Sequence, residues 1–339
     1  MTKVRAWAAM AAGQELERYD YEPGPLGDED VEIAVEHCGL CHSDLSMIDN
    51  EWRFASYPLV PGHEAVGRIV AAGSRVRGLI VGQRVGVGWN SGSCMHCASC
   101  IGGDHHLCNE AQATIAGHHG GFADRLRAHW AWAVPLPEGL DAGSAGPLFC
   151  GGITVFSPFV EFGITPLSRV GVVGIGGLGH LALRFARAWG CEVTAFTSTP
   201  AKFDEARALG AHRVVSSTDA AAMAAIAGSL DLVIVTVNVP LDWSAILATL
   251  APKGRLHFVG AVLEPVAVKP FALIGGQKSV SGSPIGSPAT VAQMLAFCAR
   301  HGIQPQVERF PMSRVNEALD HLRAGKARYR IVLDADFGA

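Results

Sequence analysis

A glycine-rich turn at residues 174–179 constrains the fold of this chain more than any other feature. Gly174, Gly176 and Gly179 form the pattern G-x-G-x-x-G, directly after the apolar run VGVV and directly before the helical pattern of LGHLALRFARAWG. In this context the backbone of the turn can approach a pyrophosphate, whose charge then faces the amides at the start of the helix. The pattern predicts dinucleotide binding through Gly174, Gly176, Gly177, Leu178 and Gly179. The alternative is a glycine-rich turn that binds no ligand.

The segments around this turn alternate between strand and helix. The runs EVTAFT, VVSS, LDLVIVTV and RLHFVG have the pattern of buried strands, and PAKFDEARALG has that of a helix. This alternation predicts an α/β domain with a doubly wound parallel sheet, of the Rossmann type, over residues 152–288.

The remaining segments predict a different domain. Residues 1–151 contain short alternating runs such as VEIAVEHCG and GRIVAAG, with Gly and Pro at close intervals. That pattern is typical of an irregular β-barrel. After Pro288, two amphipathic helical patterns precede a closing strand, YRIVLDA. We expect residues 289–339 to return to the first domain.

Composition and charge limit the classes of partner that this chain can bind. The chain has 339 residues, a formal net charge of -4 and no run of five or more Lys or Arg residues. It therefore lacks the electrostatic footprint of a nucleic-acid or anionic-membrane binder, so we expect a small-molecule partner. The N-terminal apolar stretch is interrupted by Gly, Gln and Glu, and the run from Leu230 to Val239 by Asp231 and Asn238. We expect no secretory signal, no membrane span and a cytoplasmic location.

Four of the nine cysteines form the pattern C-x2-C-x2-C-x7-C. Thiolates at this spacing can close a tetrahedral sulfur site, which predicts structural zinc. The ligands would be Cys94, Cys97, Cys100 and Cys108. An iron–sulfur cluster is an alternative, but its fourth cysteine follows at shorter spacing with a proline after it, whereas Asn109 stands here. Free thiols are the other alternative. Metal binding is favoured in a reducing compartment, where disulfides are rare.

Three separated segments supply a second set of metal-binding side chains. These are Cys41 in CGLCHSD, His63 and Glu64 in PGHE, and Cys150 in LFCGG. Two thiolates and one imidazole leave a coordination position open, as in catalytic zinc sites. Spacing alone leaves a second interpretation open, since a single histidine or a buried cysteine is commonly a core residue.

The order of these motifs resembles that of the zinc-dependent medium-chain alcohol dehydrogenases. It is most similar to the cinnamyl-alcohol-dehydrogenase and bacterial aldehyde-reductase branch, from VEIAVEHCGLCHSD to the terminal ARYRIVLDA. The resemblance implies a GroES-like β-barrel catalytic domain beside the Rossmann domain. It also implies two zinc ions per chain, one catalytic and one structural.

The resemblance also implies roles for single residues. Cys41, His63 and Cys150 would bind the catalytic zinc, with Glu64 beside the metal as an exchangeable ligand, and Asp44 would orient a zinc-bound histidine. Ser43 takes the position of the hydroxyl that relays the proton. The family often has a histidine three residues further on, where this chain has Ser46. The outer relay is therefore left to a water chain or to His42. The remaining cofactor contacts would be His42, Val259, Gly260, Ser281 and Arg330.

The residues after EVTAF indicate which dinucleotide is bound. NAD enzymes carry an acidic residue about twenty positions after the glycine-rich turn, where it binds the ribose 2′-hydroxyl. Here Thr197, Ser198 and Thr199 occupy that place, followed by Lys202, and no acid occurs before Asp204. Hydroxyls and an ammonium group accept a 2′-phosphate, so NADP(H) is favoured over NAD(H). Alternatively, these hydroxyls only end the strand and Lys202 is solvated.

Together these patterns predict a zinc-dependent alcohol dehydrogenase or aldehyde reductase. It would transfer a hydride between NADP(H) and a primary alcohol/aldehyde pair, aromatic or medium aliphatic, as a homo-oligomer (dimer or tetramer). Trp52, Phe54 and Trp89 flank the zinc segments and would form an apolar substrate pocket, unless they are ordinary core residues. The alternatives are an NAD-dependent polyol or secondary-alcohol dehydrogenase, a noncatalytic dinucleotide-binding homologue and a zinc-ribbon nucleic-acid binder.

Overall fold

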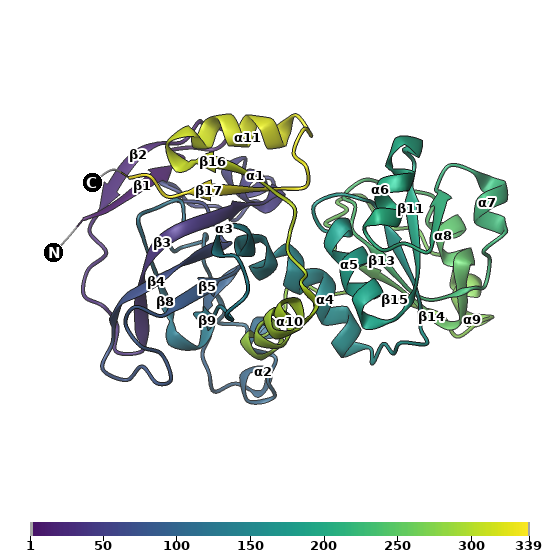
Figure 1. Cartoon of the computed structure of the whole chain (residues 1–339), viewed down its shortest axis with the longest axis horizontal. Coiled ribbons are helices and arrows are strands. Elements are labelled where there is room, and N and C mark those ends of the chain that lie inside the picture. Colours follow the sequence, from purple (N-terminus) through teal and green to yellow (C-terminus); the bar gives the residue numbers. More distant parts are fainter. Residues whose placement is uncertain (1–2, 338–339) are drawn as a thin grey trace. The chain divides into compact units, whose positions relative to one another are not determined.

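The computed structural model describes residues 3–337, and the chain divides into two compact units. The first unit comprises residues 1–153 and 285–339, and the second comprises residues 154–284. Figure 1 shows the helices and strands of both units with the labels used below. Among the described residues no single helix is long and apolar enough to cross a membrane, although the bent pair Ala142–Phe149 and Gly151–Glu161 together meets that length and composition.

The first unit is built on a seven-stranded sheet whose strands run β16-β17-β3-β4-β5-β9, with β8 also paired to β3. β3 pairs antiparallel with its neighbours, and its alternate residues, such as Val31 and Ile33, enter the core, as one-sided burial of antiparallel strands requires. The last strand, β17, pairs antiparallel with β3 (Figure 1). The strands are β3 (Asp30–Leu40), β4 (Ala65–Ala72), β5 (Arg84–Val87), β8 (Arg125–His129), β9 (Val134–Pro135), β16 (Val307–Pro311) and β17 (Arg330–Asp334).

Shorter elements complete the first unit. Two small antiparallel pairs are β1 (Val4–Ala8) with β2 (Glu17–Tyr21), and β6 (Asn90–Gly92) with β7 (Gln112–Ala113). The α-helices are α1 (His42–Ile48), α2 (Ala98–Ile101), α3 (Ala142–Ala145), α10 (Pro288–His301) and α11 (Val315–Arg323). The two amphipathic helices predicted near the C-terminus are α10 and α11.

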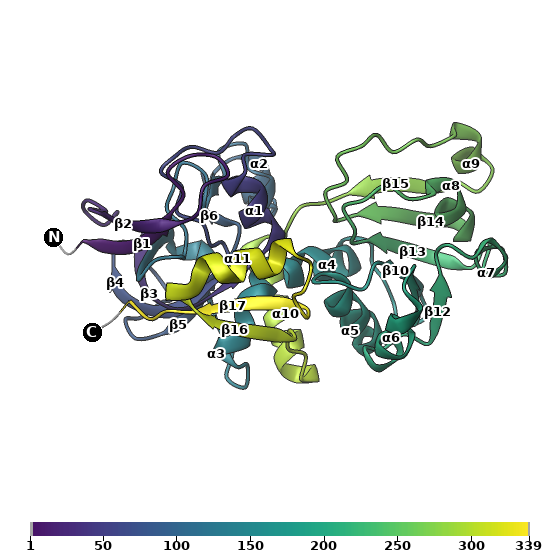
Figure 2. The same cartoon turned by 90° about the horizontal axis from the view of Figure 1, so that it is seen from above.

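The second unit is a six-stranded parallel sheet in the order β12-β11-β10-β13-β14-β15. Numbered within the unit this order is 3-2-1-4-5-6, that of the dinucleotide-binding Rossmann fold, so the predicted doubly wound sheet is confirmed. The strands are β10 (Arg169–Val173), β11 (Glu192–Thr197), β12 (Arg213–Ser216), β13 (Leu230–Val235), β14 (Leu250–Phe258) and β15 (Ser279–Gly282). Figure 2 shows β10, β13, β14 and β15 of this sheet side by side.

Both faces of this sheet are buried. Val233 and Val235 of β13 pack in one cluster with Ile246 and Leu247 of α8, while the intervening Ile234 is equally buried. Burial on both faces explains why LDLVIVTV shows no polar alternation. The helices are α4 (Gly151–Glu161), which crosses the boundary between the units, α5 (Gly179–Trp189), α6 (Phe203–Ala208), α7 (Ala220–Ala224), α8 (Trp243–Thr249) and α9 (Pro270–Ile274).

Candidate active site

Cys41, His63, Glu64 and Cys150 meet inside the first unit. One ligand atom from each lies within 4.8 Å of all the others, and all four residues are buried. Cys41 precedes α1, His63 and Glu64 precede β4, and Cys150 precedes α4. The sulfurs of Cys41 and Cys150 are 4.0 Å apart. The fold therefore brings together side chains from three segments, the first and last of which lie more than a hundred positions apart in the sequence.

Asp44 orients this cluster from the first turn of α1. Its carboxylate accepts hydrogen bonds from the backbone N–H of Cys41 and of Gly62, and pairs with Nδ1 of His63, each at 2.9 Å. With Nδ1 engaged, the buried Nε2 of His63 has no hydrogen-bond partner among the described residues. Metal-binding histidines typically have this arrangement, in which a carboxylate accepts a hydrogen bond from one ring nitrogen and the other nitrogen is available to the metal.

Arg330 of β17 provides the positive charge beside this cluster. Its guanidinium is buried, donates to Glu64, and lies 3.9 Å from the Cys41 sulfur. Burial raises the pKa of Glu64 to about 7, although the charge of Arg330 opposes this shift. The hydrogen bond with Cys150 and the charge of Arg330 hold the pKa of the Cys41 thiol well below its usual range despite its burial. A lowered thiol pKa favours the thiolate, the form that binds metals.

The donor set fits a zinc ion. It offers two sulfurs and one unpartnered imidazole nitrogen, which are the ligands that zinc prefers, with a carboxylate beside them. The ion pair of Glu64 with Arg330 was not predicted, because the two residues lie 266 positions apart and neither motif refers to the other.

The four-cysteine loop forms a second cluster, in which the sulfurs of Cys94, Cys97, Cys100 and Cys108 all lie within 4.8 Å of one another. Backbone N–H groups donate to three of these sulfurs, from Cys97 to Cys94, from Cys100 to Cys97 and from Glu110 to Cys108. Such bonds stabilise thiolates, so this set also fits zinc. His96 and Glu110 lie near Cys94 at the edge of the cluster and are exposed.

The glycine-rich turn joins β10 to α5 in the second unit, as predicted. Gly174 has a φ of 94°, which favours glycine, and a Cβ on Gly179 would lie 1.9 Å from the Gly174 carbonyl oxygen. A Cβ on Gly176 would meet nothing within 4 Å, so the backbone there is open to a ligand. The three glycines therefore meet the three requirements of a dinucleotide-binding turn, which are a tight turn, a close approach of the backbone to the pyrophosphate and close packing of helix and strand.

Six further predicted cofactor residues lie in or just after β11, β14 and β15 of the same unit. Thr197 ends β11, Ser198 and Thr199 follow it in exposed positions, and Lys202 Nζ donates to the carbonyl of Ile175 in the glycine-rich turn at 3.0 Å. Val259 and Gly260 follow β14, and both N–H groups donate to the Val235 carbonyl. The hydroxyl of Ser281 is 2.9 Å from Nδ1 of the buried His257, a contact that the sequence did not indicate.

The three predicted pocket aromatics form a row that ends at the first cluster. The Trp89 ring lies edge-on to the His63 ring, with their centroids 5.1 Å apart. The centroids of Trp52 and Trp89 are 5.8 Å apart, and Phe54 stacks on Trp52 with a centroid distance of 5.9 Å. Phe54 is 51% exposed, so the row runs from a buried histidine toward solvent.

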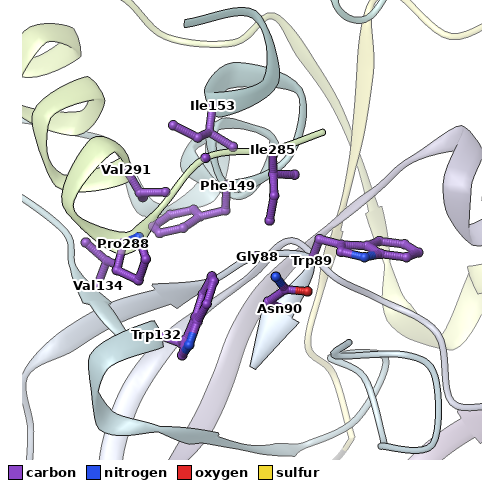
Figure 3. Close-up of a pocket in the computed structure, with 11 residues that line it drawn as sticks. Gly88, Trp89, Asn90, Trp132, Val134, Phe149, Ile153, Ile285, Pro288 and Val291 are labelled. Atoms are coloured by element: carbon purple, nitrogen blue, oxygen red, sulfur yellow. The ribbon is translucent and has the colours of Figure 1, made fainter. Parts of the chain in front are cut away.

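A small apolar pocket of the first unit shares only Trp89 with this row. Figure 3 shows that the Trp89 indole points away from the other lining side chains, and neither Trp52 nor Phe54 lines the pocket. The lining residues are Gly88, Trp89, Asn90, Trp132, Val134, Phe149, Ile153, Ile285, Gly286, Pro288 and Val291.

The predicted proton-relay residues follow Cys41 along α1. The Ser43 hydroxyl lies 3.8 Å from the Cys41 sulfur, whereas His42 is exposed. Ser46, at the position where the family often has a histidine, is buried and donates a hydrogen bond to Glu51.

The chain matches two family models. Residues 27–138 match the alcohol dehydrogenase GroES-like domain, and residues 177–300 match the zinc-binding dehydrogenase model. Aldehyde reductase AdhA of Synechocystis sp. is 56% identical over 97% of this chain and 98% of its own length. Probable cinnamyl alcohol dehydrogenase 6 of Arabidopsis thaliana is 40% identical over 97% of this chain and 93% of that protein.

Two solved structures share the whole fold. A cinnamyl alcohol dehydrogenase from Sorghum bicolor superposes with a TM-score of 0.94 at 40% identity, and the match covers 98% of each chain. CAD from Helicobacter pylori, solved as a complex with NADP(H), superposes with a TM-score of 0.90 at 29% identity, again over 98% of each chain. The chain therefore belongs to the zinc-dependent medium-chain alcohol dehydrogenases, in the branch of the cinnamyl alcohol dehydrogenases and aldehyde reductases.

Proposed function

We propose that this enzyme uses NADPH to reduce aromatic and medium aliphatic aldehydes to primary alcohols. The observation that carries the proposal is the convergence of Cys41, Cys150 and the unpartnered Nε2 of His63 at the inner end of an aromatic row. Relatives named aldehyde reductase and cinnamyl alcohol dehydrogenase, and the NADP(H) complex of the Helicobacter pylori structure, support the same reaction and cofactor.

When bound, zinc supplies a Lewis acid for the carbonyl oxygen and NADPH supplies the hydride. Cys41, His63 and Cys150 would hold the ion, and Asp44 engages Nδ1 of His63, which leaves Nε2 available as a ligand. Ser43, beside Cys41, delivers the proton to the product oxygen.

The aromatic row would select the substrate. A chain of rings from His63 through Trp89 and Trp52 to Phe54 offers an apolar surface for an aromatic or aliphatic aldehyde and excludes water from the reacting carbonyl. A polyol, whose hydroxyls need hydrogen-bond partners, would lose those partners against these rings.

A substrate panel tests this function. Aromatic aldehydes, medium aliphatic aldehydes, polyols and secondary alcohols are each assayed with both dinucleotides. We expect the highest kcat/KM for primary aldehydes with NADPH. A higher value for a polyol or secondary alcohol with NAD would overturn the proposal in favour of the NAD-dependent alternative.

The cofactor preference rests on Ser198 and Lys202, and Ser198→Asp is expected to weaken it. A carboxylate there repels a 2′-phosphate but accepts a hydrogen bond from a 2′-hydroxyl. We expect the ratio of kcat/KM for NADPH over NADH to fall at least about tenfold, which corresponds to about 1.4 kcal/mol. Ala224→Asp, which adds the same charge at an exposed position of α7, should leave the ratio unchanged. An unchanged ratio in Ser198→Asp would contradict this assignment.

We also propose a homodimer formed through β15. This strand is the last of the parallel sheet and, within residues 3–337, pairs only with β14. Before it, α9 exposes Phe271 and Ile274 by 82% and 69%. An open strand edge beside exposed apolar side chains is typical of an interface.

Replacing both Phe271 and Ile274 by glutamate is expected to convert the dimer to monomers, because two buried charges at the interface would lack partners. Sedimentation velocity at several protein concentrations measures the mass. The control is Leu167→Glu, which places one such charge on another exposed apolar residue of this unit. A double variant that remains dimeric would place the interface elsewhere.

We place the enzyme in the cytoplasm. All nine cysteines are free thiols in the structure, and both metal clusters need thiolates. A reducing compartment keeps them in that form.

A further inference from the structure

We propose that His96 and Glu110, together with the sulfur of Cys94, form a transfer site through which zinc ions reach and leave the four-cysteine cluster. That cluster consists of Cys94, Cys97, Cys100 and Cys108. The inference does not rest on the proposed function, because aldehyde reduction takes place at the other cluster and leaves the ion of this one in place.

The three side chains of the transfer site each offer one ligand atom. The Cys94 sulfur, a ring nitrogen of His96 and a carboxylate oxygen of Glu110 all lie within 4.8 Å of one another. A zinc ion binds sulfur, nitrogen and oxygen ligands at about 2.0 to 2.3 Å, so atoms this close can share one ion. Three protein ligands leave a fourth position for water or for a chelating molecule that delivers or removes the ion.

The four-cysteine cluster has an outer and an inner side. Cys94 and Cys97 are half-buried, whereas Cys100 and Cys108 are buried, with 3% and 7% of their surface exposed. Solvent therefore meets the cluster at its outer side, where the transfer site shares Cys94 with it. An ion that leaves the cluster passes these outer sulfurs last.

Local backbone conformation holds the other two ligands of the transfer site near the cluster. Met95 has a φ of 62°, in the left-handed region, and the chain bends just before His96. The N–H of Glu110 donates to the sulfur of Cys108 at 3.3 Å. The His96 and Glu110 side chains are exposed, and within residues 3–337 neither of them has a hydrogen bond or an ion pair. Both side chains are therefore available to a cation.

Zinc transfer between the two sites is an exchange of ligands. Cys94 binds the incoming ion together with the His96 imidazole and the Glu110 carboxylate. The three other thiols of the cluster then displace the imidazole and the carboxylate, and each thiol that binds loses its proton to solvent. Release reverses these steps, and the protons return to the thiols. Because the Cys94 sulfur belongs to both sites, it stays bound throughout.

A purely structural role for His96 and Glu110 makes the opposite prediction. If these side chains only stabilised the loaded cluster, their removal would weaken zinc binding and make zinc release faster. Removal of a transfer site instead slows loading and release by the same factor, because a path affects rates and leaves the equilibrium unchanged. The direction of the change in the release rate therefore separates the two roles.

Zinc release is measured by adding the chromogenic chelator pyridylazoresorcinol to the holoenzyme and following the absorbance of its zinc complex. The kinetic phase that is missing from Cys150→Ala belongs to the catalytic ion, and the remaining phase belongs to the four-cysteine cluster. We expect the rate of this remaining phase to fall at least about tenfold in His96→Ala and in Glu110→Gln, the lower end of the effects that supporting groups have at zinc sites.

Two further measurements and three control variants complete the test. Zinc content at equilibrium with a fixed chelator concentration, and the melting temperature, should be the same in both variants as in the unaltered enzyme. Glu110→Asp, which keeps a carboxylate, should retain most of the release rate. His105→Ala, in the same loop but outside the transfer site, and Glu17→Gln, an exposed glutamate of β2, should release zinc like the unaltered enzyme.

An unchanged or faster release in either His96→Ala or Glu110→Gln would overturn the transfer site. Slower release that is matched by tighter binding at equilibrium would also overturn it, because the cluster itself would then have become more stable. Failure of the proposed function would leave these results as they are, since neither an aldehyde nor NADPH takes part in the measurement.

Discussion

Replacement of Cys150 by alanine is expected to remove one of two zinc ions from each chain and to lower kcat/KM for aldehydes at least about a thousandfold. Cys150 supplies one of the two sulfurs of the buried cluster, 4.0 Å from Cys41. Without it the ion keeps one sulfur and one imidazole, which is fewer than the three protein ligands of catalytic zinc sites. Lewis-acid stabilisation of the transition state is worth several kcal/mol, and about 1.4 kcal/mol changes a rate tenfold.

Zinc content by elemental mass spectrometry and steady-state kinetics check this prediction together. Cys298→Ala is the matched control, since Cys298 is a fully buried cysteine of α10 outside both clusters. The control should keep both ions and its activity. Two zinc ions in Cys150→Ala, with activity near normal, would refute the ligand assignment.

Replacement of Cys100 by alanine is expected to remove the other zinc ion and to lower the melting temperature by about 10 °C. Cys100 is buried, and its sulfur lies 3.9 Å from that of Cys94. The loop around it has only short elements of three or four residues, so the metal must provide most of its stability. A loss of about 5 kcal/mol, part of the usual binding energy of structural zinc, shifts a melting point by this amount.

Thermal unfolding followed by circular dichroism measures the shift, with zinc content determined on the same sample. His105→Ala, in the same loop but outside the sulfur cluster, should keep both the zinc and the melting temperature. If Cys100→Ala melted like the unaltered enzyme, the cluster would not hold a structural ion.

Features that depend on neighbouring residues in the chain could be predicted from the sequence. The periodicity of α5, α10 and α11 is readable because each is at least nine residues long, and the glycine-rich turn has its own steric requirements at Gly174 and Gly179. Helices α8 and α9, which have seven and five residues, complete fewer than two full turns, and the sequence did not predict them, whereas the six-residue α6 was predicted within PAKFDEARALG.

The catalytic cluster was predictable only in part. Spacing could not distinguish Cys41, His63 and Cys150 from ordinary core residues, and it was the resemblance to a family that implied a shared site. The sequence likewise offered no sign that the Ser281 hydroxyl would meet His257, because that contact depends on how β14 and β15 pair.

By itself the sequence determined the two fold types, the four-cysteine loop and the dinucleotide turn, because each depends on spacing within a short stretch of chain. The surroundings of the catalytic cluster depend on contacts between residues that are not neighbours within one regular element. Arg330 reaches Glu64 because β17 pairs with β3, and Ser46 meets Glu51 because the turn after α1 folds back. Such contacts follow from backbone packing, which brings distant residues within a few ångströms and leaves no periodic trace in the sequence.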